Sequence, residues 1–319
     1  MGGSEAAAGT IGKTNTLLEK RKGLESGFRR VFHALAATLL PSRCMGCGIL
    51  FNPPAAGNPS LNGPVTGGAY ADKTVSSVTG NGFDDESQRN VSPTAVLNMA
   101  QWVCPRCIAG WVPVMSPLCS VCGTPFNSRE GDDHVCGECL QVPKNLRMAR
   151  AAAIYTPLTL TLLHGFKYNS KIQLAGPFGA MLADAFVRFW DVGDVDLVLP
   201  VPLHRRRFRR RGFNQAYLLA KALIRQLNRI ESESTITTVE RGALLRTRRT
   251  ASQTGLKRKG RLQNIKDAFR VKKTAAIKDR CILLIDDIYT TGATVNECAK
   301  VLLGSGALRV DVLTVARAV

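Results

Sequence analysis

The sequence predicts an α/β protein, with a parallel sheet flanked by helices and, before it, a small domain built on two zinc ribbons. Two observations support this prediction. Eight of the ten cysteines form four Cys-x-x-Cys pairs in the first half of the chain. Near the carboxyl end, an apolar run over 281–285 leads through a loop of small residues into a helical pattern over 295–303 and a second strand over 308–315. A strand, a helix and a strand in this order form a crossover with parallel strands.

Length and charge limit the kind of protein this is. The 319 residues are enough for two domains and a sizeable core. The net charge of +19, from 43 Lys and Arg against 24 Asp and Glu, favours an anionic partner such as nucleic acid, a polyphosphate or a membrane surface. No apolar run has the length of a transmembrane segment, and the amino terminus does not resemble a signal peptide. We therefore expect a cytoplasmic protein.

The first expected region is 1–40. Residues 1–22 are polar and basic, which is typical of a disordered tail. Apolar side chains at 28, 31, 32, 35 and 39 predict an amphipathic helix over 24–40 that packs on the next domain. The helix is expected to end before Pro41, because the residue before a proline disfavours the helical conformation.

The second region, 41–142, carries the cysteine pairs. In a reducing compartment such pairs are typical of metal ligands rather than disulfides, and two pairs complete one tetrahedral zinc site. Four pairs therefore predict two closed, structural zinc sites without an open position for catalysis. The predicted ligands are Cys44, Cys47, Cys104, Cys107, Cys119, Cys122, Cys136 and Cys139. Sequence order favours joining the first pair to the second and the third to the fourth, and a cross-braced arrangement stays open.

Three other side chains of metal-binding type are interpreted differently. His134 is expected to be a surface histidine, because eight cysteines already complete two sites. Cys281 and Cys298 lie among apolar residues and are predicted to be core cysteines.

A long polar segment separates the first two cysteine pairs. Residues 52–100 are rich in Gly, Asn, Ser, Pro and Thr and show no sustained apolar period. A compact domain does not need a loop of this length, so we predict a disordered insertion. It need not separate the two halves of the ribbon in space, because the entropy of loop closure rises slowly with length.

The third region, 148–319, has the composition of an α/β domain. The expected strands are 151–155, 195–199 and 269–271, and the expected helices are 158–166, 174–189 and 214–227. Pro200 and Pro202 end the second strand, and a loop is predicted over 204–215. This loop contains six arginines in seven positions, which repel one another unless an anion neutralises them.

Residues 244–264 are basic, rich in hydroxyl groups and interrupted by glycines. This composition predicts a mobile loop that closes on an anion. A solvent-exposed basic linker is the alternative.

The loop after the 281–285 run combines two kinds of binding group. Asp286 and Asp287 accept hydrogen bonds, and they suit vicinal sugar hydroxyls or a Mg²⁺ held mostly by its ligand. The next five residues offer hydroxyls and N–H groups at a helix start, where partial positive charge favours a phosphate. They are Thr290, Thr291, Gly292, Ala293 and Thr294. Together these groups predict a ribose 5-phosphate site, with an ordinary acidic strand end and helix cap as the alternative.

The stretch 285–294, Ile-Asp-Asp-Ile-Tyr-Thr-Thr-Gly-Ala-Thr, resembles the signature of type I phosphoribosyltransferases. In that family the acidic pair contacts the ribose hydroxyls of phosphoribosyl pyrophosphate, and the loop holds its 5-phosphate. The resemblance implies a type I phosphoribosyltransferase-like fold that binds phosphoribosyl pyrophosphate with Mg²⁺.

Residues 41–319 as a whole resemble the ComF family, which is associated with DNA uptake in competent bacteria. Besides the cysteine pairs and the signature, the resemblance rests on motifs at 163–168, 200–215 and 250–264. It implies a pyrophosphate-binding loop that contains Val201, Pro202, Arg205, Arg206, Arg207 and Arg211. It also implies a flexible loop, closing over the site, that contains Gln253, Gly255, Arg258 and Arg261. The insertion at 52–100 is not part of the family pattern.

Two functions compete at this point. The first is Mg²⁺-assisted transfer of a phosphoribosyl group to an acceptor that the sequence does not identify. Its catalytic residues are unassigned, because the aspartate that some purine-specific relatives carry near the position of Thr290 is absent, and His164 and His204 are lone histidines of a kind that is more often structural. The second is a non-catalytic module that binds single-stranded DNA or senses a ligand beside other DNA-uptake proteins.

Overall fold

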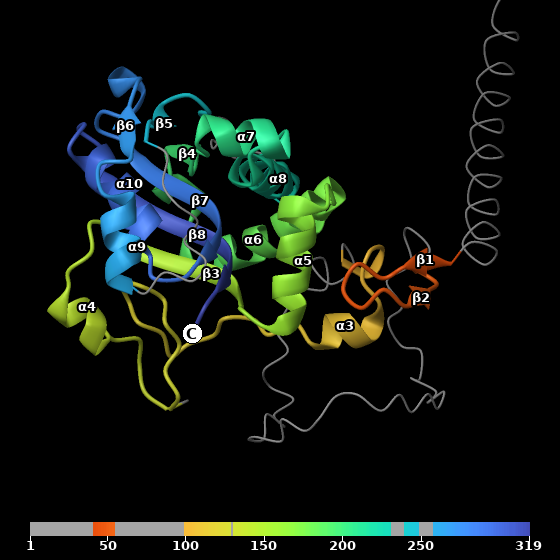
Figure 1. Ribbon diagram of the computed structural model, residues 1–319. Coiled ribbons are helices and arrows are strands. Elements are labelled where there is room, and N and C mark those ends of the chain that lie inside the picture. Colours follow the sequence, from red (N-terminus) through yellow and green to blue (C-terminus); the bar gives the residue numbers. More distant parts are fainter. Residues whose placement is uncertain (1–40, 55–98, 129, 231–238, 249–257) are drawn as a thin grey trace, which may run out of the picture.

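The computed structural model describes residues 41–54, 99–128, 130–230, 239–248 and 258–319 (Figure 1). The predicted tail and helix of 1–40 lie outside these ranges, as does the predicted insertion except for its two ends.

Four parallel strands form the central sheet, in the order β3, β8, β7, β4 (Figure 1). Their bounds are β3 Met148–Ile154, β4 Leu197–Pro200, β7 Cys281–Tyr289 and β8 Arg309–Arg317. Helix α10, Ala293–Leu303, connects β7 to its neighbour β8. The crossover predicted from the sequence is therefore confirmed.

The apolar side chains of β7 alternate between two cores. Leu283 and Ile285 pack with residues of α5, α6 and α8 on one face, and Ile282 and Leu284 pack with residues of α9 and α10 on the other. The remaining helices of these layers are α5 Pro157–Tyr168, α6 Ala175–Phe189, α8 Gln215–Ile230 and α9 Arg258–Ile265. Strands covered on both faces need continuous apolar runs, which is why β7 begins with one. The predicted α/β class, a parallel sheet flanked by helices, is confirmed.

The cysteine-bearing segments come before the sheet in the chain and cover both cores. Their short elements are β1 Ser42–Arg43, β2 Leu50–Phe51, α3 Pro105–Ala109 and α4 Gly137–Gln141. Cys44 and Cys104 belong to the core on the α5, α6 and α8 face. Cys119, Cys122 and Cys139 belong to the core on the α10 face. Each half of the cysteine region therefore covers a different side of the sheet.

Strand β3 is longer than the sequence predicted, because it starts at Met148 rather than at 151. The cause is Arg150, a charged residue that is nonetheless buried in the strand. Its guanidinium donates to the carbonyl oxygens of Cys119 and Ser120, at 3.3 and 3.1 Å. Hydrogen bonds from Arg150 to the second cysteine segment thus offset the cost of burying the guanidinium.

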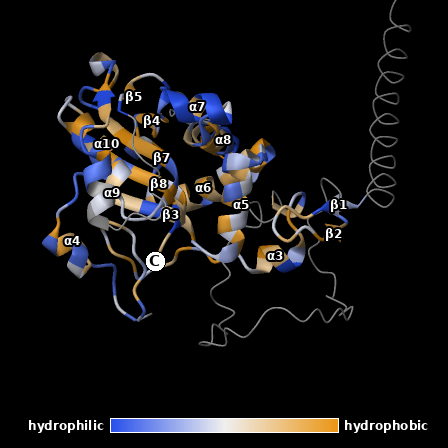
Figure 2. Ribbon diagram, viewed as in Figure 1, coloured by the Kyte–Doolittle hydropathy of each residue, from blue (hydrophilic) through white to orange (hydrophobic). Residues whose placement is uncertain are grey.

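The arginine-rich stretch predicted as a loop is a helix, α7, Arg205–Arg211. Arginine has a high helix propensity. His204 caps the first turn, since its Nδ1 accepts the N–H of Arg206 at 3.3 Å, and Gly212 ends the helix with φ of +80°. Figure 2 shows α7 as a strongly hydrophilic helix beside the sheet.

Part of the predicted mobile loop is also regular structure. Leu244–Arg246 forms β5, which pairs antiparallel with β6, Phe269–Val271. Helix α9 occupies the end of the basic stretch, and residues 249–257 lie outside the described ranges. Among the described residues, no helix is both long enough and apolar enough to cross a membrane.

Candidate functional site

The acidic pair lies at the carboxyl edge of the sheet, inside β7 rather than after it. Asp286 pairs in register with Thr314 of β8, and the strand continues to Tyr289. On the other side β4 ends at Pro200, opposite Ile285, and the N–H of Val201 donates to the Ile285 carbonyl at 2.9 Å. The fold therefore brings the segment with Val201 and Pro202 beside the acidic pair.

Asp287 forms an ion pair that the sequence analysis did not anticipate. Its Oδ1 lies 2.9 Å from Nζ of Lys167, near the end of α5, and the two side chains are only 14% and 17% exposed. Helix α5 is fixed at its start by a capping box between Thr156 and Thr159. The motif at 163–168 contains this lysine, so the motif was the available signal. A cation is thus held against the carboxylate proposed for the ribose.

The pKa of Asp286 is raised to about 7, mainly by burial and to a smaller extent by the negative charge of Asp287. The N–H of Asp287, which donates to Asp286 Oδ1 at 2.9 Å, and the charges of Lys167 and Arg246 act in the opposite direction. Near neutral pH the acidic pair therefore carries less than two full negative charges.

Helix α7 has two different faces. Arg207 and Arg211 are half-buried, and Arg211 donates to the phenol oxygen of Tyr168 at 2.9 Å while its guanidinium lies 4.6 Å from the centre of that ring. Tyr168 follows Lys167, so α7 and α5 meet beside the acidic pair. The other arginines of the helix are exposed, namely Arg205, Arg206, Arg209 and Arg210.

A third basic group approaches from β5. Arg246 is 8% exposed, and burial followed by the charge of Arg207 lowers its pKa to about 10, whereas Asp286 acts to raise it. The guanidinium lies 5.4 Å from the centre of the Phe269 ring. Arg246 belongs to the basic stretch 244–264 predicted to close on an anion, but the sequence did not single it out, and the pairing of β5 with β6 places it near the acidic pair.

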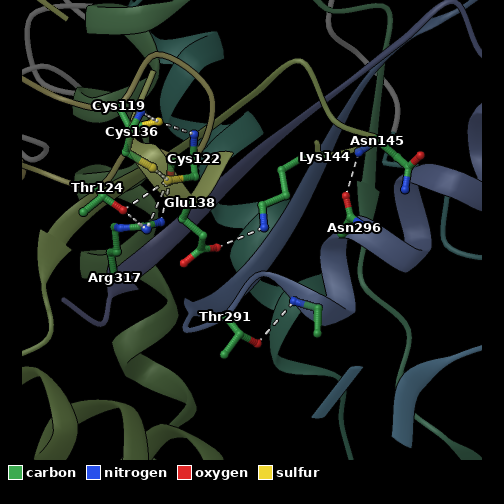
Figure 3. A network of polar contacts seen from close by, with 11 residues as sticks. Cys119, Cys122, Thr124, Cys136, Glu138, Lys144, Asn145, Thr291, Asn296 and Arg317 are labelled. Atoms are coloured by element: carbon green, nitrogen blue, oxygen red, sulfur yellow. Dashed lines mark hydrogen bonds and ion pairs between the residues drawn. The ribbon is translucent and has the colours of Figure 1, made fainter. Parts of the chain in front are cut away.

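The small-residue loop follows β7 directly. Gly292 is buried with φ of +71°, and a Cβ there would overlap the Tyr289 ring, so only glycine fits. Thr291 Oγ1 accepts the N–H of Ala293 at 3.4 Å (Figure 3). Thr290 is exposed and Thr294 is half-buried on the first turn of α10. The predicted phosphate-binding residues thus lie together at a helix start.

The remaining predicted site residues are placed only in part. Gln253 and Gly255 lie outside the described residues, whereas Arg258 and Arg261 lie on α9. His164 is exposed on α5, with its ring 4.7 Å from that of Tyr168. His204 caps α7, as described above. Neither histidine gains a catalytic assignment from these contacts.

The eight cysteines form two groups of four in the order favoured by the sequence. Cys44, Cys47, Cys104 and Cys107 make one group, and Cys119, Cys122, Cys136 and Cys139 make the other. Within each group all sulfur atoms lie within 4.8 Å of one another. A tetrahedral zinc with Zn–S bonds of about 2.3 Å requires sulfurs about 3.8 Å apart, and the Cys47–Cys104 and Cys122–Cys136 pairs are at 3.7 and 3.8 Å. The two groups therefore fit zinc.

Backbone groups prepare one thiolate in each group. Burial alone would raise the pKa of Cys44, but N–H groups of Cys104, Cys47 and Gly46 lower it to about 6. The pKa of Cys119 is likewise lowered to about 6 by N–H groups, against the effect of burial. Deprotonated sulfur is the form that binds a metal. Among the described residues, the half-buried Cys281 and the buried Cys298 belong to neither group.

Known proteins resemble this chain over most of their length. It is 35% identical over 205 residues to the DNA utilization protein YhgH of Escherichia coli O6:H1. The aligned residues cover 63% of this chain and 84% of that protein. Competence protein F of Haemophilus influenzae is 32% identical over 207 residues, or 63% of this chain and 85% of that protein. Competence protein ComFC of Bacillus subtilis is 28% identical over 221 residues, or 66% and 82%. No protein-family model matches the chain.

The cysteine geometry predicts about two zinc ions per chain, and Cys122→Ser should reduce this to about one. Because structural zinc binding contributes folding free energy, the substitution should also destabilise the protein by more than about 4 kcal/mol. Metal analysis and thermal unfolding test this, with Cys281→Ser as the control that keeps both ions. One ion or none in the wild type, or loss of zinc in the control, would contradict the assignment.

The raised pKa of Asp286 predicts a pH-dependent cost of folding. Between about pH 4 and pH 7 the folded state binds a proton that the unfolded chain has released, so this residue's contribution to stability is lost as pH rises through that window. Asp286→Asn should therefore be more stable than the wild type above pH 7, by on the order of 1–2 kcal/mol, and equal to it near pH 4.

Urea unfolding at pH 5, 6, 7 and 8 measures this difference. Asp196→Asn is the matched control, because it makes the same change away from the acidic pair, at a side chain that accepts the N–H of Cys281 at 2.7 Å. A constant difference between Asp286→Asn and the wild type across the series would disprove the role of burial.

Proposed function

This chain belongs to the ComF family, and from that premise we propose that it binds phosphoribosyl pyrophosphate with Mg²⁺ at the carboxyl edge of the sheet and transfers the phosphoribosyl group to an acceptor, in the service of DNA uptake. The relatives are named for competence and DNA utilization. The observation that carries the proposal is the Lys167–Asp287 ion pair, because it joins the acidic pair to the basic helices beside it.

Each end of the ligand has a suitable partner. Ribose hydroxyls would donate to Asp286 and Asp287, and the 5-phosphate would accept N–H groups of the loop after β7 at the start of α10. The pyrophosphate would face Arg207 and Arg211 on the inner side of α7. On binding, a ribose hydroxyl would take the place of the Lys167 ammonium group as the partner of Asp287. The ammonium group would then pair with the departing pyrophosphate.

The chemistry at the anomeric carbon needs stabilisation of a departing anion. Arginines and a lysine at the pyrophosphate stabilise that charge without a proton transfer, and the acidic pair fixes the ribose for attack by the acceptor. Bound Mg²⁺ would supply further charge neutralisation on the pyrophosphate. Positive charge that develops on the ribose ring lies close to Asp286 and Asp287, which favours cleavage of the anomeric bond.

Calorimetry with phosphoribosyl pyrophosphate and Mg²⁺ tests the binding step. Asp287→Asn removes a charged acceptor and should lose roughly 1.5–3 kcal/mol of binding free energy, and Thr291→Val should weaken the phosphate end. Asp196→Asn, the same change at the opposite end of β7, where this residue accepts the N–H of Cys281 at 2.7 Å, should bind like the wild type. Absence of wild-type binding at millimolar ligand defeats the proposal, and pyrophosphate release across a panel of bases and amines tests turnover.

The outer face of α7 favours a second function, binding of single-stranded DNA. Four exposed arginines lie there, and Arg241 stacks over the rings of Phe208 and Tyr217, at 5.8 and 5.1 Å from their centres. Cationic groups beside aromatic rings are typical of single-strand binding surfaces.

Replacing Arg209 and Arg210 together by glutamine should reduce the salt dependence of single-strand binding by roughly 1.4 in log–log slope, since each phosphate contact contributes about 0.7. The same variant should bind phosphoribosyl pyrophosphate normally. Filter binding of an oligothymidine between 50 and 300 mM salt gives the slope. The pair Arg207→Gln and Arg211→Gln is the inner-face control, and equal effects of both pairs on both ligands would refute two separate faces.

A further inference from the structure

One arginine joins the second four-cysteine group to the candidate phosphate loop. Arg317 is the last residue of β8 and is only 6% exposed. Its guanidinium donates to the carbonyl oxygen of Cys122, to the Sγ of Cys122 at 3.4 Å and to Oγ1 of Thr124 (Figure 3). The arginine is therefore hydrogen-bonded to one of the four cysteines of this group.

The same guanidinium supports the floor of the loop. It lies 4.6 Å from the centre of the Tyr289 ring, which is itself buried. Gly292 rests on this ring so closely that no Cβ fits between them. The path from Cys122 to the loop thus consists of two side chains, Arg317 and Tyr289, with direct contact at each step.

A second contact holds the start of α10. The N–H of Asn145, in the segment after α4, donates to Oδ1 of Asn296 at 2.7 Å (Figure 3), and the N–H of Asn296 donates to the Gly292 carbonyl at 2.9 Å. Cys119, Cys122 and Cys139 also share one apolar core with Tyr289 and Ala293. The first four-cysteine group makes none of these contacts among the described residues, since its buried cysteines Cys44 and Cys104 lie in the other core.

We propose that Arg317 is a positioning residue, through which metal binding at Cys119, Cys122, Cys136 and Cys139 orders the loop 289–294 before the ligand arrives. This rests on the proposed function for the identity of the ligand, a phosphate monoester of ribose. A metal-bound Cys122 keeps its sulfur and carbonyl oxygen fixed, so the forked guanidinium is fixed too, and the Tyr289 ring below Gly292 cannot tilt. An ordered loop binds phosphate without an entropic cost for its own ordering.

The experiment compares hydrogen exchange and ligand binding in the full chain. Arg317→Met removes every donor but keeps much of the bulk, and it should speed amide exchange in 289–296 at least fivefold in the ligand-free protein. Calorimetry with ribose 5-phosphate should show at least tenfold weaker binding, whereas inorganic pyrophosphate with Mg²⁺ should bind within twofold of the wild type. Zinc content should stay at about two ions, which separates this effect from loss of the metal.

Two further variants keep the test decisive if Arg317→Met folds poorly. Thr124→Val removes one acceptor of the guanidinium and leaves all cysteines in place, so it should give a smaller change in the same direction. Arg147→Met removes an arginine that binds Asp311 at 2.9 and 2.7 Å near the other end of β8, and it should leave exchange in 289–296 unchanged.

Unchanged exchange in 289–296 in Arg317→Met and Thr124→Val overturns the positioning role, whatever the ligand data show. Equal acceleration in Arg147→Met also overturns it, because the effect would then be general destabilisation. If exchange is faster in Arg317→Met but the wild type does not bind ribose 5-phosphate, the positioning role is retained and the proposed ligand is rejected.

Discussion

The burial of β7 on both faces is the constraint on which the rest of the structure depends. Ile282, Leu283, Leu284 and Ile285 are at most 1% exposed, so each face of the strand needs a full apolar cover. Helices α5, α6 and α8 cover one face, and α9 and α10 cover the other. A charged group in the middle of such a strand needs buried partners, as Arg150 of β3 has, and in β7 the two carboxylates instead follow the apolar run at the carboxyl end. This places Asp286 and Asp287 beside the end of β4 and just before the start of α10.

Basic side chains gather around that edge. Asp287 already has Lys167 as its partner, whereas Arg207 and Arg246 are close enough for one to lower the pKa of the other. Under the proposed function, the polyanion would relieve the repulsion between these arginines and would offer Lys167 a second partner. Asp286, with its pKa near 7, need not add a second full negative charge beside Asp287. The repulsion between these arginines is therefore consistent with the proposed phosphorylated ligand.

Features with a local cause could be predicted from the sequence, and features with a tertiary cause could not. The order of the cysteine pairs along the chain favoured the two groups that the structure has, although a cross-braced arrangement stayed open, and the apolar period predicted the strand, loop and helix around the acidic pair. Lys167, Arg246 and Arg317 were missed as individual site residues because a single charged residue in a helix or strand resembles a surface residue until its partner is known. Arg150 shortened the predicted β3 for the same reason. The charge of α7 suggested a loop, although arginine is a good helix former and His204 and Gly212 supply both ends.

The two four-cysteine groups support different parts of the carboxyl edge of the sheet. The first group covers the face of α5, and Lys171, three residues after Tyr168, donates to the Met45 carbonyl at 3.3 Å. The second group contacts the loop after β7 through Arg317 and Tyr289. Cys47 and Cys104 come within 3.7 Å although 57 residues separate them. Closing a chain of that length costs roughly 3–4 kcal/mol, which is well below the free energy of about 10–16 kcal/mol that a structural zinc site supplies. A long insertion between the two halves of the first group is therefore compatible with the contact between this group and the end of α5. The same contact helps to hold Lys167 in position against Asp287.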